Sequence, residues 1–242
     1  MAAILYPIFT IAQLLLFFRL WKLRRGSGKR VAGVLILQVV LFSLIYDNLI
    51  ISVGGLLGEG DLLERLNLGR FVLRAVFTPL LMVTVVEFAA RGSVKWAKNF
   101  ISRIIIGFAT VSLMGLGIFL NVFASSELVP ESFSGTLRYA QIPAAPPIPT
   151  ILTILVVIIF GALIWRAVKW PWVFAGGLIM FIGSAVPISL VGPVVNSGVE
   201  VLLMWSLIAT ANRLDTPDYS LSESELDSRI SRVSAGRSKK SS

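Results

Sequence analysis

The chain has 242 residues, of which 56% are hydrophobic and 14% charged, and its formal net charge is +9. Soluble domains carry about a quarter charged residues, so this composition excludes an ordinary water-soluble protein and favours one embedded in lipid. Cysteine and histidine are both absent, which excludes disulfides, thiolate nucleophiles, and metal or acid–base sites built on these two residues.

Seven stretches are long and apolar enough to cross a bilayer, because a hydrocarbon core of about 30 Å needs roughly 20 apolar residues per helix. We therefore predict an all-α, polytopic integral membrane helix bundle. The seven expected transmembrane helices cover residues 2–20, 31–53, 71–90, 100–123, 148–164, 171–190 and 194–212. The first lacks a basic start and a small-residue cleavage site, so we expect a retained span rather than a signal peptide.

Lysine and arginine residues sort onto alternate sides of this arrangement. Eighteen fall on the first, third and fifth connections and on the C-terminal tail, whereas four fall on the opposite side. Basic residues are retained in the cytoplasm, so the pattern predicts an odd number of spans with the N-terminus outside and the C-terminus inside. The positive charge then reflects orientation, and we expect no nucleic-acid partner. We expect a multi-pass protein of the plasma (inner) membrane.

Three segments outside the spans carry their own signals. Residues 213–242 are rich in serine and charge, so we expect a largely disordered cytoplasmic tail. Residues 54–69 place Asp61, a candidate helix cap, before several leucines, which predicts a short amphipathic helix on the outer membrane surface. Residues 124–149 end in a segment with four prolines, 143–149, which favours a stiff extended connector.

Ionisable residues within the spans need an explanation, because each costs at least ~2.5 kcal/mol near the bilayer centre. Three of them share a depth: Asp47, Arg74 and Glu200 all fall within about 10 Å of the outer surface, at a rise of roughly 1.5 Å per residue. We therefore expect them to meet in one polar layer in the outer half of the bundle.

Neighbouring polar residues enlarge this layer. Tyr46 and Asn48 flank Asp47. Arg70 lies four residues before Arg74 and Asn196 four before Glu200, each one helical turn away. Successive helical residues point in different directions, so at most one of Tyr46 and Asn48 is expected to share the face of Asp47. The candidate ligand-binding residues are accordingly Asp47, Arg74, Glu200, Tyr46, Asn48 and Asn196.

The polar layer has two interpretations. In the first, Asp47 and Arg74 form an ion pair that fixes the packing of the second and third helices, with Glu200 hydrogen-bonded nearby. In the second, the layer is an outward-facing pocket in which Arg74 holds an anionic group and an acid exchanges protons or binds a cation. Nearer the cytoplasmic side, Gln13 and Gln38 are expected to form an amide-to-amide hydrogen bond between the first two helices.

Three functions follow from these interpretations. The first is the binding or transport of a small solute, ion or lipid ligand at the polar layer. The alternative is a membrane scaffold or assembly partner whose polar layer is structural. A lipid-modifying enzyme using Asp47 or Glu200 as acid or base ranks last, because the chain lacks histidine and a metal-ligand cluster. The lipid bilayer is the expected partner, and the sequence identifies no cofactor and no protein partner.

Overall fold

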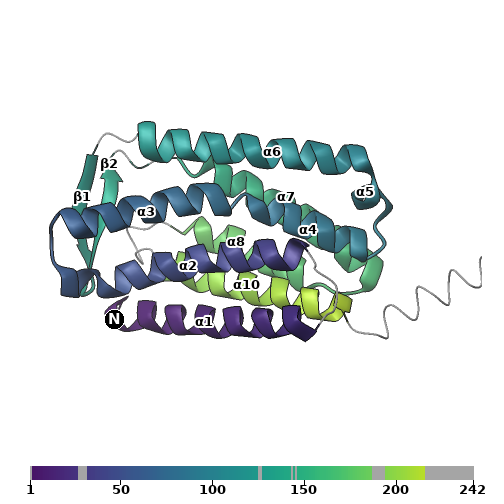
Figure 1. Ribbon diagram of the computed structural model, residues 1–242, viewed down its shortest axis with the longest axis horizontal. Coiled ribbons are helices and arrows are strands. Elements are labelled where there is room, and N and C mark those ends of the chain that lie inside the picture. The colour runs from purple at the N-terminus through teal and green to yellow at the C-terminus, as the bar shows by residue number, and fades with distance from the viewer. Residues whose placement is uncertain are drawn as a thin grey trace, which may run out of the picture.

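The computed structural model describes residues 2–26, 32–124, 127–142, 144, 146–186 and 194–215. Most of them belong to helices that run side by side, and a short hairpin of two strands caps one end of the bundle (Figure 1). The elements are α1 (Ala2–Gly26), α2 (Ala32–Leu57), α3 (Asp61–Phe77), α4 (Leu80–Arg91), α5 (Lys95–Lys98), α6 (Phe100–Ile118), the π-helix η1 (Phe119–Phe123), β1 (Glu127–Phe133), β2 (Thr136–Ile142), α7 (Ile148–Val168), α8 (Trp172–Ser184) and α10 (Val194–Asp215).

Six helical segments are long and apolar enough to cross a membrane, which confirms an all-α bundle and marks the chain as a membrane-embedded protein. They cover Ala2–Arg24, Ala32–Leu57, Asp61–Arg91, Phe100–Phe123, Ile148–Val168 and Val194–Asp215, and match six of the seven expected spans. The remaining expected span, residues 171–190, contains α8, which has 13 residues. Residues 187–190 of that expected span lie outside the described part. The count of seven therefore stays a prediction.

The core of the bundle forms around α2, which packs against α1, α3, α4 and β2. Leu37 and Leu41 on this helix are fully buried, as is Phe88 on the neighbouring α4. The outer helix α6 packs mainly on α3 and α4 and exposes large apolar side chains such as Phe100 and Phe108. Apolar side chains on the outside of a bundle suit contact with lipid rather than water.

The third span differs from its expected form. Residues 61–70 do not make a separate surface helix; they are the first turns of α3, which continues to Phe77 and leads through Thr78 and Pro79 into α4. Proline interrupts a helix because it lacks an N–H and clashes with the preceding turn. Asp61 is the first helical residue rather than the cap, which is Gly60. Arg70 therefore lies well inside a helix and not at its start.

The expected extended connector is also wrong for residues 127–142, which form the antiparallel pair β1–β2. Its turn, Ser134 and Gly135, has positive φ at both residues (48° and 86°), as the tight turns of two-residue hairpins require. Arg138 Nε donates to Glu131 Oε2 across the strands at 3.0 Å. The hairpin packs on α2 so closely that a Cβ at Gly54 would lie 1.9 Å from the Leu137 carbonyl oxygen.

The two ends of the bundle differ in charge. The hairpin and the N-terminus of α1 mark one end, here called the hairpin end, and the C-terminal ends of α1, α4 and α10 lie at the other (Figure 1). The described arginines and lysines of the first, third and fifth connections, such as Arg91 and Lys169, belong to that second end, the basic end. Arg213 is still within α10, and the rest of the expected tail, residues 216–242, lies outside the described residues.

Candidate functional site

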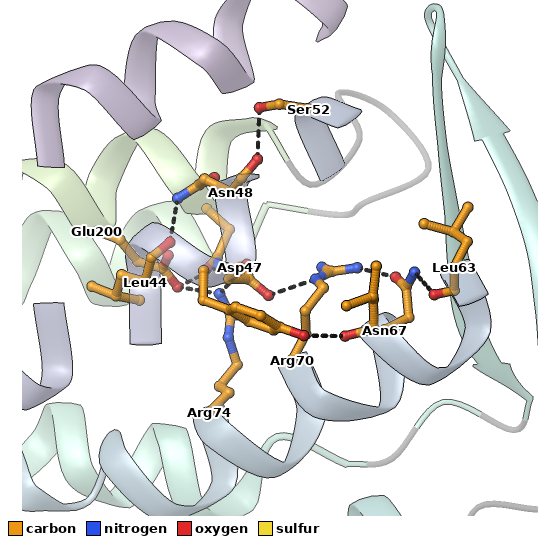
Figure 2. A network of polar contacts seen from close by, with 12 residues as sticks. Leu44, Asp47, Asn48, Ser52, Leu63, Asn67, Arg70, Arg74 and Glu200 are labelled. Atoms are coloured by element: carbon orange, nitrogen blue, oxygen red, sulfur yellow. Dashed lines mark hydrogen bonds and ion pairs between the residues drawn. The ribbon is translucent and has the colours of Figure 1, made fainter. Parts of the chain in front are cut away.

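Asp47 lies at the centre of a group of buried charges between α2, α3 and α10. Arg70 Nε donates to its Oδ1 at 2.9 Å, and Arg74 Nη2 donates to its Oδ2 at 3.3 Å (Figure 2). Arg70 and Arg74 are one helical turn apart, so α3 presents both guanidinium groups on the face that meets α2. The Asp47 and Arg70 side chains are only 8% and 6% exposed. We call Asp47, Arg70, Arg74 and Glu200 the charged cluster.

Glu200 brings the last span into the cluster. Its Oε1 accepts a hydrogen bond from Arg74 Nη2 at 2.7 Å and another from Asn196 Nδ2 at 2.9 Å. Asn196 Oδ1 in turn accepts from Ser184 Oγ at 3.1 Å, which connects α10 to the end of α8. The predicted shared depth of Asp47, Arg74 and Glu200 therefore corresponds to direct contact among them.

Arg70 is the member of the cluster that was not among the candidate ligand-binding residues. Besides Asp47 it contacts Asn67 Oδ1, and Asn67 Nδ2 donates to the Leu63 carbonyl at 2.7 Å (Figure 2). The spacing of four residues from Arg74 marked Arg70 as a neighbour of the polar layer. It was left out of the candidate ligand-binding residues, and the third span was expected to begin at residue 71.

Tyr46 and Asn48 flank Asp47 and leave α2 in different directions, as helical geometry requires. The Tyr46 hydroxyl donates to the Leu66 carbonyl on α3 at 3.1 Å, and it fits because residue 69 is glycine; a Cβ there would lie 2.9 Å from the hydroxyl oxygen. Asn48 faces α1 instead, where its Nδ2 donates to Gln13 Oε1 at 3.0 Å. Tyr46 thus shares the α3 side with Asp47 and Asn48 does not.

The pairing expected for Gln13 is therefore wrong. Gln13 contacts Asn48, while Gln38 Oε1 accepts from Arg24 Nη1 at 3.1 Å nearer the basic end. The glutamine side chains were matched by their estimated depth alone. Gln38 instead pairs with a charged guanidinium, which is a stronger partner than an amide, and Gln13 pairs with a different amide within the core.

Four buried polar atoms near the cluster have no hydrogen-bond partner among the described residues: Tyr6 Oη, Gln13 Nε2, Asn48 Oδ1 and Glu200 Oε2. They come from α1, α2 and α10. Tyr6 is fully buried and interacts electrostatically with Asp47, Arg70 and Glu200. An unpartnered buried polar atom costs about 1–3 kcal/mol, so a group of them next to buried charges is typical of a site completed by water, an ion or a ligand.

The cluster is electrically balanced, with two carboxylates and two guanidinium groups. Three contacts join them, Asp47 with each arginine and Arg74 with Glu200. Sequence reasoning had counted two acids around one base, so Arg70 supplies the missing positive charge. The Arg74 side chain is 34% exposed whereas those of Asp47 and Glu200 are 8% exposed, so Arg74 forms the accessible edge.

The described parts of the chain contain no group of three or more acidic, cysteine or histidine side chains suited to a metal ion. The arrangement instead offers two kinds of contact. A carboxylate oxygen and an amide oxygen accept hydrogen bonds or a small cation, and an accessible guanidinium edge pairs with an anionic group.

Comparison with protein-family models, with curated proteins and with solved structures finds no match for this chain.

Proposed function

We propose that this chain is a seven-span membrane protein that binds or transports a small solute or ion at the charged cluster in the outer half of its bundle. The proposed topology places the N-terminus and the hairpin outside and the C-terminus in the cytoplasm of a plasma (inner) membrane. In support, the end of α8 lies beside the start of α10, where Ser184 Oγ donates to Asn196 Oδ1 at 3.1 Å, and the basic residues gather at the end opposite the hairpin.

One observation carries the proposed binding role: Glu200 Oε2 is buried and has no partner among the described residues, although the other oxygen of the same carboxylate has two. A purely structural ion pair gains most when every lone pair is satisfied. A carboxylate oxygen left open inside an apolar bundle favours a site for a proton, a cation or a hydrogen-bond donor of a solute.

The geometry also suggests how binding would affect the cluster. Arg74 Nη2 is shared between Glu200 Oε1 at 2.7 Å and Asp47 Oδ2 at 3.3 Å. A positive ligand or a proton on Glu200 weakens its attraction for Arg74, which then favours the contact with Asp47. Occupancy of Glu200 is thereby coupled to the contact between α3 and α10. Contacts between helices that change with occupancy are what alternating transport requires.

The experiment that tests this proposal is a thermal-stability screen of purified protein against monovalent cations and small polar metabolites. We expect at least one compound to raise the melting temperature of the wild type, and Glu200→Gln to remove that response. Glu87→Gln is the matched control, because it makes the same chemical change in another span, on α4, outside the cluster. A stabilising compound whose effect survives Glu200→Gln would contradict the proposed site.

Mass spectrometry of small molecules and lipids that co-purify with the protein provides a second readout that needs no preselected compounds. We expect a molecule present with the wild type and lost in a folded Asp47→Asn, Glu200→Gln variant. Identical profiles for the two proteins, together with a stability screen in which no compound raises the melting temperature, would favour the scaffold function instead.

The scaffold function is the alternative, and a specific observation favours it. The charged groups pair across α2, α3 and α10 and leave no net charge, as interhelical contacts that only fix packing would do. A stable complex with another membrane protein that survives neutralisation of the cluster would support this alternative. A lipid-modifying activity remains the third hypothesis, and no described contact favours it.

A further inference from the structure

A groove opens between the end of α7 and the start of α8, at the basic end and far along the chain from the charged cluster. It encloses about 440 Å³ and is lined by Ala162, Leu163, Trp165, Arg166, Lys169 and Phe174. Most of these side chains are apolar, and the two charged ones are both positive. The groove thus combines an apolar wall with a cationic rim.

The apolar wall is rigid because α7 and α8 are in close contact beside it. A Cβ on Gly161 would lie 2.6 Å from the backbone nitrogen of Phe174, so only glycine permits this approach. The Trp165 and Phe174 rings, one from each helix, have centroids 5.5 Å apart. The two aromatic side chains form an apolar surface that can lie along a hydrocarbon chain.

The cationic rim consists of Arg166 and Lys169, which are exposed and make no hydrogen bond or ion pair through their side chains with any described residue. Lys169 caps α7 in the left-handed conformation, with φ of 55°, at a position where glycine is the favoured residue. A lysine therefore occupies a position at which glycine, which has no side chain, would fit better. The N-terminus of α8 begins three residues later and adds a partial positive charge.

The groove lies at the end of the bundle where tryptophans gather. Four partly exposed tryptophans, Trp21, Trp96, Trp165 and Trp172, belong to helix ends at the basic end. Tryptophans of this kind concentrate at the membrane–water interface, and basic pockets between helices on the cytoplasmic side bind anionic lipid headgroups.

We propose that this groove binds an anionic phospholipid, with the phosphate between Arg166 and Lys169 and an acyl chain against Trp165 and Phe174. The charge complementarity of the rim and the apolar wall both favour a lipid over a free anion. The inference depends on the chain being embedded in a membrane and is independent of any ligand at the charged cluster.

The test measures the melting temperature of the full chain in neutral detergent micelles titrated with dioleoylphosphatidylglycerol, dioleoylphosphatidylcholine or inorganic phosphate. Only phosphatidylglycerol is expected to raise it. Arg166→Gln combined with Lys169→Gly should weaken the apparent affinity for phosphatidylglycerol about 30-fold, the effect of two interfacial cations. Lys169→Gly alone should leave the lipid-free melting temperature unchanged or higher, because glycine suits the left-handed cap.

Two control variants distinguish a specific lipid-binding site from attraction of the lipid by general surface charge. Arg19→Gln with Lys22→Gln removes two cations at the same spacing from α1 and should retain the response to phosphatidylglycerol. Ala162→Phe fills the groove without changing charge and should abolish the response. A response lost equally in both charge variants, or one that persists with Ala162→Phe, would overturn the proposal. Equal stabilisation by inorganic phosphate would also overturn it, in favour of a simple anion site.

Discussion

Arg74 and Glu200 are 126 positions apart in the sequence, yet Arg74 Nη2 lies 2.7 Å from Glu200 Oε1. The same nitrogen lies 3.3 Å from Asp47 Oδ2, so a single guanidinium group joins α2, α3 and α10. Interhelical contacts within a membrane are otherwise made largely by van der Waals packing. This guanidinium is therefore the position at which a change in charge should have the widest effect on the bundle.

Replacing Asp47 with alanine should destabilise the protein by about 3–5 kcal/mol, because it leaves Arg70 and Arg74 without their shared carboxylate in a buried layer. The measurement is the melting temperature or denaturant midpoint in detergent. Glu64→Ala is the control, since it removes another carboxylate, in the first turn of α3 and outside the cluster, and it should change stability by no more than about 0.5 kcal/mol. Equal stability of Asp47→Ala and the wild type would mean that the cluster does not hold the helices together.

A double-mutant cycle should show that Arg74 and Glu200 are coupled. Arg74→Gln and Glu200→Gln each leave a charged partner buried, whereas the double variant removes both charges. The double variant should therefore be more stable than the sum of the two single effects predicts, by about 0.5–3 kcal/mol. The parallel cycle of Arg74→Gln with Glu87→Gln should be additive within about 0.5 kcal/mol. Additivity in both cycles would show that the Arg74–Glu200 contact contributes nothing.

The sequence was sufficient to bring Asp47, Arg74 and Glu200 together, because charges inside apolar spans are rare and costly and must pair at a common depth. It was not sufficient for Arg70. Placing that residue in the site required knowing that α3 begins at Asp61. Residues 61–70 resemble a surface segment because they are mostly polar or exposed, and only Leu63, Asn67 and Arg70 among them are buried. Tertiary packing, not local pattern, sets this boundary.

The hairpin was missed for a related reason. Pro130 lies within β1, opposite Tyr139, and a proline argues against a strand in most sheets. In a sheet of two strands both are edge strands, so one proline is tolerated. The docking of the hairpin also depends on contacts with residues far away in the sequence, such as the bond from the Gly60 N–H to the Tyr139 hydroxyl at 3.1 Å. No local pattern encodes such contacts.

Gly54→Ala should loosen the hairpin, because the added methyl group would lie 1.9 Å from the Leu137 carbonyl oxygen. We expect a loss of about 1–3 kcal/mol, typical of overpacking, together with faster proteolysis of residues 127–142. Gly115→Ala is the matched control on α6, where an added Cβ meets nothing within 4 Å. That variant should be as stable as the wild type, or more so. Similar behaviour of the two variants would show that the hairpin is not docked on α2 as described.

Reporter fusions decide the topology that underlies the proposed function. A reporter that is active only outside the cytoplasm should be active when fused after Gly135, in the hairpin turn, and inactive when fused after Gly92 or after Ser242. Between Gly135 and the C-terminus the proposed topology has three crossings, through α7, the expected span that contains α8, and α10. If α8 turns back without crossing, two crossings remain, and the reporters at Gly135 and Ser242 fall on the same side. The fusion after Gly92 controls for orientation, because four crossings precede the hairpin and three precede Gly92.

Agreement between Gly135 and Ser242 would reduce the count to six spans. Activity after Gly92 and not after Gly135 would reverse the orientation and place the charged cluster in the inner half of the membrane.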